Sequence, residues 1–473
     1  MHFSIPDTQE LNEGNGSTFI GYNIHINGVF HCTVRYKQLH NLNEQLKKEF
    51  GNDIVPCFPP KKILPLTSGQ LEERRALLEK YIQTVGQDSK LVSSELLSGF
   101  LRSAQQETAC QEKQDINLDI YTMTNYPIKI RACTYDRTEY VLWKALKQIN
   151  LPHEYVQYFS LYLIKVGSNG DVTVIRKLLD LESPYLTQQI IRTATRIVIR
   201  KGSWDKNYDS ELMTDPVAMN LLYLQTMFEV ENGWIITNRE NKMQLDKIKS
   251  RLAKKEYIEF AQKLKYYGFM QFCPCYCDYP QAQTKVLVAI GDEELSLRIL
   301  KPGNVVTEGL FKVTRMRCWR IVATNNKHTY PENESYSNNV SNNSALELSF
   351  EYLMSKDNLQ WITITSEQAI LMSVCLQSLV DELLIKKNGT KKIEPVRNHG
   401  KWTYMKRDGS CQLISSENSG LSHSDDLEGQ SETNFQEPFS IKKLQEKFSS
   451  VSFKSGREFI ENHAFEGIGD EDL

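Results

Sequence analysis

Three pairs of neighbouring residues near the start of the chain are best suited to chemistry: one combines a cation with an aromatic ring, and two combine two cations. They are Arg35-Tyr36, Lys61-Lys62 and Arg74-Arg75. A guanidinium group presents a planar fork of donors that suits a phosphate or carboxylate better than an ammonium group does, and a tyrosine ring offers a flat apolar face. The pattern favours binding of an anion. Each residue taken alone is more simply explained as a solvated charge or a core side chain.

Other reactive residue types form no comparable pattern. Cys273, Cys275 and Cys277 alternate with other residues, which fits a strand whose thiols face a core better than it fits the paired spacing of zinc sites. The sequence lacks the phosphate-loop, dinucleotide-binding, HExxH and GxSxG motifs. We therefore expect a binding protein that is not an enzyme, with neither metal nor cofactor; an enzyme of unrecognised type is an alternative.

Length and composition limit the class of protein. The chain has 473 residues, enough for roughly three domains. Its 56 Lys and Arg balance 59 Asp and Glu, which argues against binding to nucleic acid through a general basic excess. No apolar stretch reaches the length of a membrane span, and the first residues lack the features of a secretory signal. We expect a cytosolic protein with reduced thiols.

The cationic pairs fall in an α+β segment. Residues 18–37 read as two strands joined by Asn27-Gly28, a dipeptide typical of hairpin turns. A helix-periodic stretch follows, then a proline-rich loop at residues 56–60, then helices from Thr67 to about residue 106. This order predicts an antiparallel sheet covered by helices.

The rest of the chain divides into three more units and a tail. Strands and one helix in residues 113–202 suggest a ubiquitin-like lobe, and residues 203–270 read as a small helical bundle. Residues 271–387 combine several strands with one C-terminal helix, as in a pleckstrin-homology-like sandwich. Residues 388–473 are first basic and then rich in Ser and acids, which predicts a largely disordered tail. The basic part, residues 386–408, is either a membrane-surface contact or a solvated linker.

These features in order resemble a known family. The Arg35-Tyr36 pair, the Pro-Pro-Lys loop and Arg74 resemble the signature of a PX domain, here residues 1–108. The three following lobes resemble a FERM module, with a PH/PTB-like third lobe. PX followed by FERM is the layout of the PX–FERM subfamily of sorting nexins. The segments TRMRCWR, LQWITITS and the end FEGIGDEDL are similar to members of that subfamily.

The PX resemblance implies a site for phosphatidylinositol 3-phosphate. Arg35 would bind the 3-phosphate, Tyr36 would stack on the inositol ring and Lys61 would meet the 1-phosphate. Arg74 would bind the 4- and 5-hydroxyls, which disfavours rings phosphorylated there. The neighbouring Lys62 and Arg75 would share these roles, and Ile63-Leu64 at the loop apex would insert shallowly into the bilayer.

The FERM resemblance implies a site for NPxY or NxxY motifs in the cytoplasmic tails of receptors, of lipoprotein-receptor or integrin type. An extended peptide adds to a sheet edge beside the C-terminal helix. The matching residues here are Trp319, Val380 and Leu384. The alternative is that they are core residues; Val380 and Leu384 are four apart and share one helix face.

The C-terminal resemblance implies binding to retriever, a part of the Commander recycling assembly, through Phe465, Ile468 and Leu473. A solubilising acidic tail is the alternative. The family would make this chain a monomeric adaptor, peripheral on the cytosolic face of early endosomes, that returns receptors to the cell surface and away from lysosomal degradation. The alternative from the same modules is a FERM scaffold that links receptors to the cytoskeleton or to small GTPases.

Overall fold

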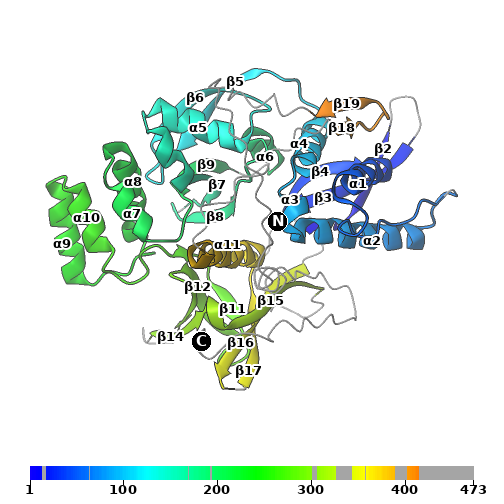
Figure 1. Ribbon diagram of the computed structural model, residues 1–473. Helices are drawn as coiled ribbons and strands as arrows, with labels where there is room; N and C mark the ends of the chain where they lie inside the picture. Colours follow the sequence, from blue (N-terminus) through cyan, green and yellow to red (C-terminus); the bar gives the residue numbers. More distant parts are fainter. Residues whose placement is uncertain are drawn as a thin grey trace.

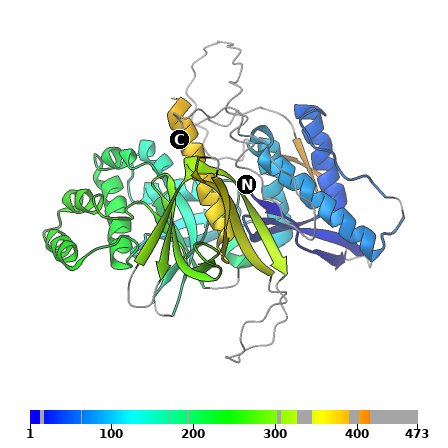
Figure 2. The same ribbon diagram turned by 90° about the horizontal axis from the view of Figure 1, so that it is seen from below.

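The computed structural model describes residues 1–12, 18–62, 64–168, 170–191, 194–300, 306–325, 344–356, 358–388 and 402–414. These residues form four lobes, drawn in Figure 1 as the N-terminal lobe at the right, the ubiquitin-like lobe at the top, the helical lobe at the left and the sandwich lobe at the bottom. Figure 2 shows the N-terminal and helical lobes at opposite ends, with the sandwich lobe between them.

The N-terminal lobe is an antiparallel sheet covered by helices, as the sequence predicts. Its elements are β1 (Phe3–Ser4), β2 (Thr8–Asn12), β3 (Thr18–Ile26), β4 (Val29–Arg35), α1 (Tyr36–Phe50), α2 (Ser68–Gln87), α3 (Ser89–Val92) and α4 (Glu95–Ala109). Strand β3 pairs with β1, β2 and β4. Asn27 and Gly28, both at positive φ, make the turn from β3 to β4, because this turn needs two left-handed residues. The Gly28 backbone lies against Ile370 of the sandwich lobe.

The ubiquitin-like lobe has a five-stranded sheet in the order β6-β5-β9-β7-β8. Its elements are β5 (Asp115–Tyr121), β6 (Pro127–Cys133), α5 (Thr138–Gln148), the 3-10 helix η1 (His153–Tyr158), β7 (Phe159–Val166), β8 (Val172–Lys177), α6 (Pro184–Ile190) and β9 (Thr195–Lys201). The central pair β5 and β9 is parallel, and the other pairs are antiparallel. This arrangement confirms a β-grasp fold.

The helical lobe continues the same hydrophobic core. It consists of α7 (Asn207–Leu212), α8 (Pro216–Glu231), α9 (Arg239–Ser250) and α10 (Lys254–Ala261). Buried leucines, isoleucines and tyrosines of α8, α9 and α10 share one apolar cluster with the ubiquitin-like sheet. A buried ion pair, Arg200 to Glu229 at 3.0 Å, joins β9 to α8. Because breaking such a pair leaves an uncompensated buried charge, it fixes one lobe on the other.

The sandwich lobe is an eight-stranded antiparallel sheet closed by one helix. Its elements are β10 (Met270–Gln271), β11 (Cys275–Cys277), β12 (Thr284–Gly291), β13 (Glu294–Leu300), β14 (Val306–Lys312), the 3-10 helix η2 (Val313–Arg315), β15 (Met316–Asn325), β16 (Ser344–Ser355), β17 (Asn358–Thr365) and α11 (Ala369–Asn388). The order β14-β13-β12-β11-β17-β16-β15 leaves β14 and β15 at its ends. Cys275 and Cys277 are buried, as their alternation predicts, and burial raises the pKa of both thiols, to about 12 and about 11. The prediction is wrong for Cys273, which is exposed because it lies before the start of β11.

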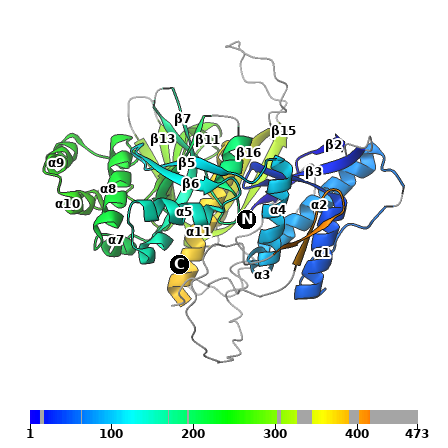
Figure 3. The same ribbon diagram turned by 90° about the horizontal axis from the view of Figure 1, so that it is seen from above.

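A hairpin in the tail corrects the prediction of disorder for part of residues 388–473. Strands β18 (Trp402–Met405) and β19 (Cys411–Ile414) pair with each other and lie against α1 and α4 of the N-terminal lobe, as Figures 1 and 3 both show. Side chains of a strand alternate between its two faces, so Trp402 and Tyr404 lie on the same face, and both are buried. Gly409, at φ +90°, lies in the turn. The physical reason is local: an Asp-Gly turn between alternating residues is a hairpin signal, which the polar composition around it obscures.

Candidate functional site

Three separately predicted segments meet around Tyr36, the first residue of α1. Its hydroxyl donates to the carbonyl of Pro59 at 2.7 Å, and its ring lies 5.4 Å from the ring of Phe58, both in the proline-rich loop. From α2, the guanidinium carbon of Arg74 lies 4.5 Å from the centre of the Tyr36 ring. We call Tyr36, Arg74 and the adjoining Arg35 the headgroup cluster.

Arg74 is only partly satisfied within the described residues. Its Nη2 atom is buried and has no hydrogen-bond partner among them. Tyr22 lies behind it: burial raises the pKa of the Tyr22 hydroxyl, and the charge of Arg74 opposes that rise. A buried donor without an acceptor is costly. Beside a flat ring face, it fits a ligand that brings hydroxyl or anionic oxygens.

Arg35 sits where strand β4 becomes helix α1. Its backbone N–H donates to the side-chain oxygen of Gln38 at 2.8 Å, which caps the helix. Its guanidinium carbon lies 4.2 Å from the centre of the Phe19 ring, and its Nη1 donates to the carbonyl of Arg407 at 2.7 Å. The positive end of the α1 dipole is at the same place, so this corner favours an anion.

The lysines of the proline-rich loop lie on the surface. Lys61 is exposed, and Lys62 pairs with Glu73 at 3.1 Å. Leu64 has 79% of its surface exposed, as expected of a residue at a loop apex, whereas Ile63 lies outside the described residues. Lys61 is thus available to a ligand, while Lys62 is partly neutralised by an exposed ion pair of small energetic value.

Arg75 has a different role from the one predicted. Its guanidinium donates to the carbonyl of Ile5 and to Glu79, and pairs with Glu72 on the same helix. These contacts turn it toward strand β1 and occupy its donors. Arg75 therefore ties α2 to the N-terminal strand, and we remove it from the proposed ligand set.

The second predicted site lies where α11 meets β15. Strand β15 pairs with β16 on one side and ends the sheet order on the other, so it is the edge strand on which a peptide could add. Trp319 on β15 is buried, and its Nε1 donates to Ser373 Oγ on α11 at 3.0 Å. Val380 is also buried, and Leu384 is half-buried against the same core. Trp319 and Val380 thus belong to the hydrophobic core of the lobe, which is the alternative that the sequence left open, and Leu384 is the more accessible residue.

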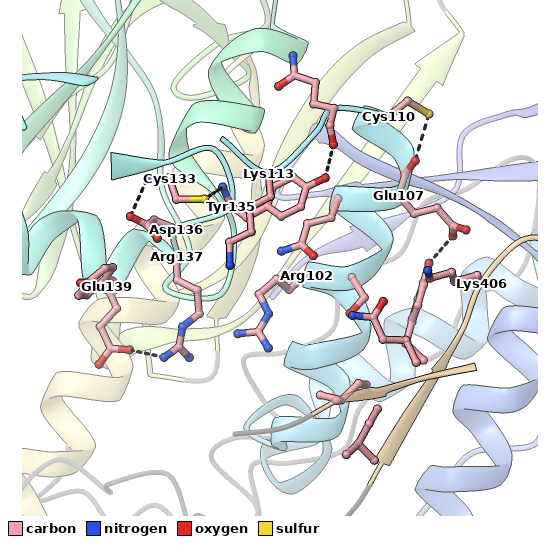
Figure 4. Close-up of a pocket in the computed structure, with 18 residues that line it drawn as sticks. Arg102, Glu107, Cys110, Lys113, Cys133, Tyr135, Asp136, Arg137, Glu139 and Lys406 are labelled. Carbon is pink, nitrogen blue, oxygen red and sulfur yellow. Dashed lines mark hydrogen bonds and ion pairs between the residues drawn. The ribbon is translucent and has the colours of Figure 1, made fainter. Parts of the chain in front are cut away.

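A cavity of about 650 Å³ lies between α4, the ubiquitin-like lobe and the hairpin. Figure 4 shows the side chains of Arg102 and Arg137 extending side by side into it. Burial, and secondly the charge of Arg137, lowers the pKa of Arg102. The cavity lies between the N-terminal lobe and the ubiquitin-like lobe, and none of the residues predicted for the two sites lines it.

Sequence reasoning missed the residues that connect the tail to the headgroup cluster. Gln38 donates to Tyr404 Oη and to the carbonyl of Met405, each at 2.9 Å. Arg407 reaches the carbonyl of Thr33 at 2.7 Å. The Asp-Gly turn between alternating residues would have revealed the hairpin, but no sequence signal indicates where it docks. The predicted partner residues Phe465, Ile468 and Leu473 lie outside the described residues.

None of the helices in the described ranges is both long enough and apolar enough to cross a membrane.

Family models match most of the chain. The PX domain model matches residues 22–104, and models of the FERM domain of sorting nexins match the three following lobes: the F1 lobe of sorting nexins 17, 27 and 31 over residues 116–204, the F2 lobe of sorting nexins 17 and 31 over residues 205–265, and the FERM C-terminal domain of sorting nexin 17 over residues 268–384.

Curated relatives agree with these models. Sorting nexin-17 of Danio rerio is 44% identical over 491 aligned residues, and that of Homo sapiens is 42% identical over 485; both alignments cover 100% of each chain. Sorting nexin-31 of Homo sapiens is 33% identical over 388 residues, which are 82% of this chain and 86% of the relative.

Proposed function

The chain belongs to the sorting nexin-17 family, and from this premise we propose that it binds phosphatidylinositol 3-phosphate and receptor tails at the same time. It is a sorting nexin with PX and FERM domains, a family of adaptors. The observation that carries the lipid half is the stacked pair of Tyr36 and Arg74, with a buried guanidinium nitrogen that no described residue accepts from.

Each residue of the headgroup cluster has a distinct task in this proposal. Arg35, at the start of α1, receives the 3-phosphate, where the guanidinium and the helix dipole act together. Tyr36 covers one face of the inositol ring. Arg74 binds the 4- and 5-hydroxyls through Nη2, which has no partner among the described residues, and this disfavours rings phosphorylated there. Lys61, exposed on the loop, meets the 1-phosphate, and Lys62 adds charge beside it.

A receptor tail adds to the sandwich lobe at β15, the last strand in the order of the described sheet. The backbone of an NPxY or NxxY peptide continues the sheet, and its side chains rest against α11. Leu384 contacts the peptide, whereas the buried residues Trp319 and Val380 set the distance between α11 and β15. These two sites make the protein peripheral on the cytosolic face of early endosomes.

The C-terminal residues Phe465, Ile468 and Leu473 bind retriever in this proposal, so that captured receptors enter the recycling route. The support is the similarity of the full chain to sorting nexin-17, which includes its last residues. The two membrane contacts reinforce each other, because binding one site raises the effective concentration at the other.

Vesicle co-sedimentation tests the lipid half. We expect the full chain to pellet with vesicles that carry phosphatidylinositol 3-phosphate, and to stay in solution with equal amounts of the 4-phosphate or of phosphatidylinositol. Arg35→Ala is expected to abolish the pelleting. Equal binding to all three lipids, or unchanged binding by Arg35→Ala, would reject the assignment.

A further inference from the structure

The turn of the tail hairpin lies beside the headgroup cluster. Residues 406–410 connect β18 to β19 and are closed by two backbone hydrogen bonds, from Lys406 N to the Ser410 carbonyl at 2.8 Å and from Gly409 N to the Lys406 carbonyl at 2.9 Å. The carbonyl of Arg407, at the tip, accepts from Nη1 of Arg35. A segment about 370 residues away in the sequence thus touches the proposed phosphate ligand.

The hairpin is built into the N-terminal lobe. Tyr404 is 2% exposed, its ring lies 5.6 Å from that of Phe100 on α4, and its hydroxyl donates to Glu107 at 2.7 Å. The side chain of Gln45 on α1 pairs with both backbone groups of Thr403, at 2.7 and 2.8 Å. Buried aromatic packing with satisfied polar groups resists displacement.

Arg407 fixes the orientation of its own carbonyl. Its Nη2 donates to the carbonyl of Thr33 at 2.7 Å and to Thr108 Oγ1 at 2.8 Å, and its backbone N–H donates to Glu107 at 2.8 Å. These contacts hold the peptide unit on β4 and α4. The carbonyl oxygen is therefore a fixed acceptor and not the mobile end of a loop.

We propose that the hairpin is part of the phosphoinositide site and that Arg407 is a positioning residue for Arg35; this inference rests on the function proposed above. The Arg35 guanidinium is held between the Phe19 ring and the Arg407 carbonyl. The bond to the carbonyl engages Nη1, one donor atom of the planar guanidinium fork, and fixes the orientation of the fork. Fixing the fork in advance lowers the entropy lost on binding.

The opposite role, a cover that blocks the site, fits the contacts less well. A displaceable cover would be held by exposed, weak contacts, whereas Tyr404 and Gln38 are both buried and hydrogen-bonded to each other. The two roles predict opposite effects of undocking the hairpin: loss of lipid affinity if it positions Arg35, and gain if it blocks Arg35.

Variants of the tail in the full chain separate these outcomes, and none of them substitutes a residue of the N-terminal lobe itself. Arg407→Ala removes the contacts that orient the carbonyl, and Ile414→Asp undocks the hairpin at its other end, where Ile414 is buried beside Gly99. Lys406→Ala is the matched control, because it removes an equal charge from the same turn with an exposed side chain.

Affinity is measured on vesicles with phosphatidylinositol 3-phosphate and on vesicles matched in charge with phosphatidylserine. We expect Arg407→Ala and Ile414→Asp each to weaken binding to the 3-phosphate vesicles about 10-fold, the value of one charge-assisted hydrogen bond. Lys406→Ala is expected to change binding to both vesicles equally. In an Arg35→Lys background the effect of Arg407→Ala should largely disappear, because the two residues act through one contact.

Each outcome decides the inference. If the wild-type chain shows no preference for the 3-phosphate, the proposed function fails and the inference falls with it. If the wild type shows the preference but both hairpin variants bind as tightly as it does, only the inference fails. Tighter binding by the variants overturns it in favour of a blocking hairpin. An equal effect of Arg407→Ala in the Arg35→Lys background would show that the hairpin acts through general charge.

Discussion

The neighbouring residues Arg74 and Arg75 provide a matched pair for testing the headgroup site. Both are cations on α2 and differ by one position, yet the structure gives them different partners. Arg74 lies over Tyr36, and its Nη2 has no hydrogen-bond partner within the described part of the chain, whereas Arg75 contacts Ile5, Glu72 and Glu79. Replacing each with Gln removes the same charge, so a difference between the variants reports on geometry.

The magnitudes follow from the lost contacts. A hydrogen bond to a charged group contributes about 1.5–3 kcal/mol, which corresponds to a change in affinity of roughly 10- to 100-fold. Arg74→Gln should weaken binding to phosphatidylinositol 3-phosphate by about that factor with a small change in stability. Arg75→Gln should instead lower the stability of the fold, because the side chains of Arg75 and Glu79 are each only 14% exposed. We expect the free energy of unfolding to drop by about 1.5–3 kcal/mol.

Two assays on the full chain measure these quantities: co-sedimentation with 3-phosphate vesicles, and thermal unfolding by calorimetry. Arg74→Gln should affect the first and Arg75→Gln the second. Equal losses of lipid binding in the two variants would refute the reasoning, because they would show that only the total charge of α2 matters. A large loss of stability in Arg74→Gln alone would make Arg74 a structural residue.

Three further predictions follow from the same geometry. Burial lowers the pKa of His2 and of His31 from 6.5 to about 4, so between these pH values the unfolded chain binds more protons than the folded chain. The free energy of unfolding should therefore fall as the pH drops from 6.5 toward 4, by about 2 kcal/mol per histidine at pH 5. Denaturant unfolding measures this, and a free energy that does not change with pH would contradict it. Val380→Asp should lower the melting temperature of the sandwich lobe because Val380 is buried, whereas Leu384→Asp should mainly reduce affinity for an NPxY peptide; the reverse order would contradict the site. Deletion of Leu473 should abolish pull-down of retriever, and unchanged pull-down would remove that partner site.

The sequence predicted the lobes well because their signals are local. Leu39, Leu42 and Leu46 recur at helical spacing and are all buried on α1. Asn27-Gly28 marked the first hairpin, and both residues have positive φ. Periodicity and turn chemistry depend on neighbouring residues only, so they can be read without knowing the fold.

The sites were predicted less completely because their geometry is not local. Arg74 and Arg75 cannot be distinguished by residue type, and only the packing of α2 on β1 turns Arg75 away. Val380 and Leu384 share a helix face, yet one is buried and the other half-buried. The docking of Arg407 on Arg35 joins residues 372 positions apart in the sequence, which no spacing rule connects.

Simultaneous binding of lipid and receptor tail is the central claim, and vesicles carrying both ligands test it most directly. The full chain is titrated with vesicles that display phosphatidylinositol 3-phosphate, a lipid-anchored NPxY peptide, both or neither. We expect the apparent affinity for the doubly decorated vesicles to exceed the better single affinity by about 100-fold or more. An affinity no higher than that of the better single vesicle would contradict the account.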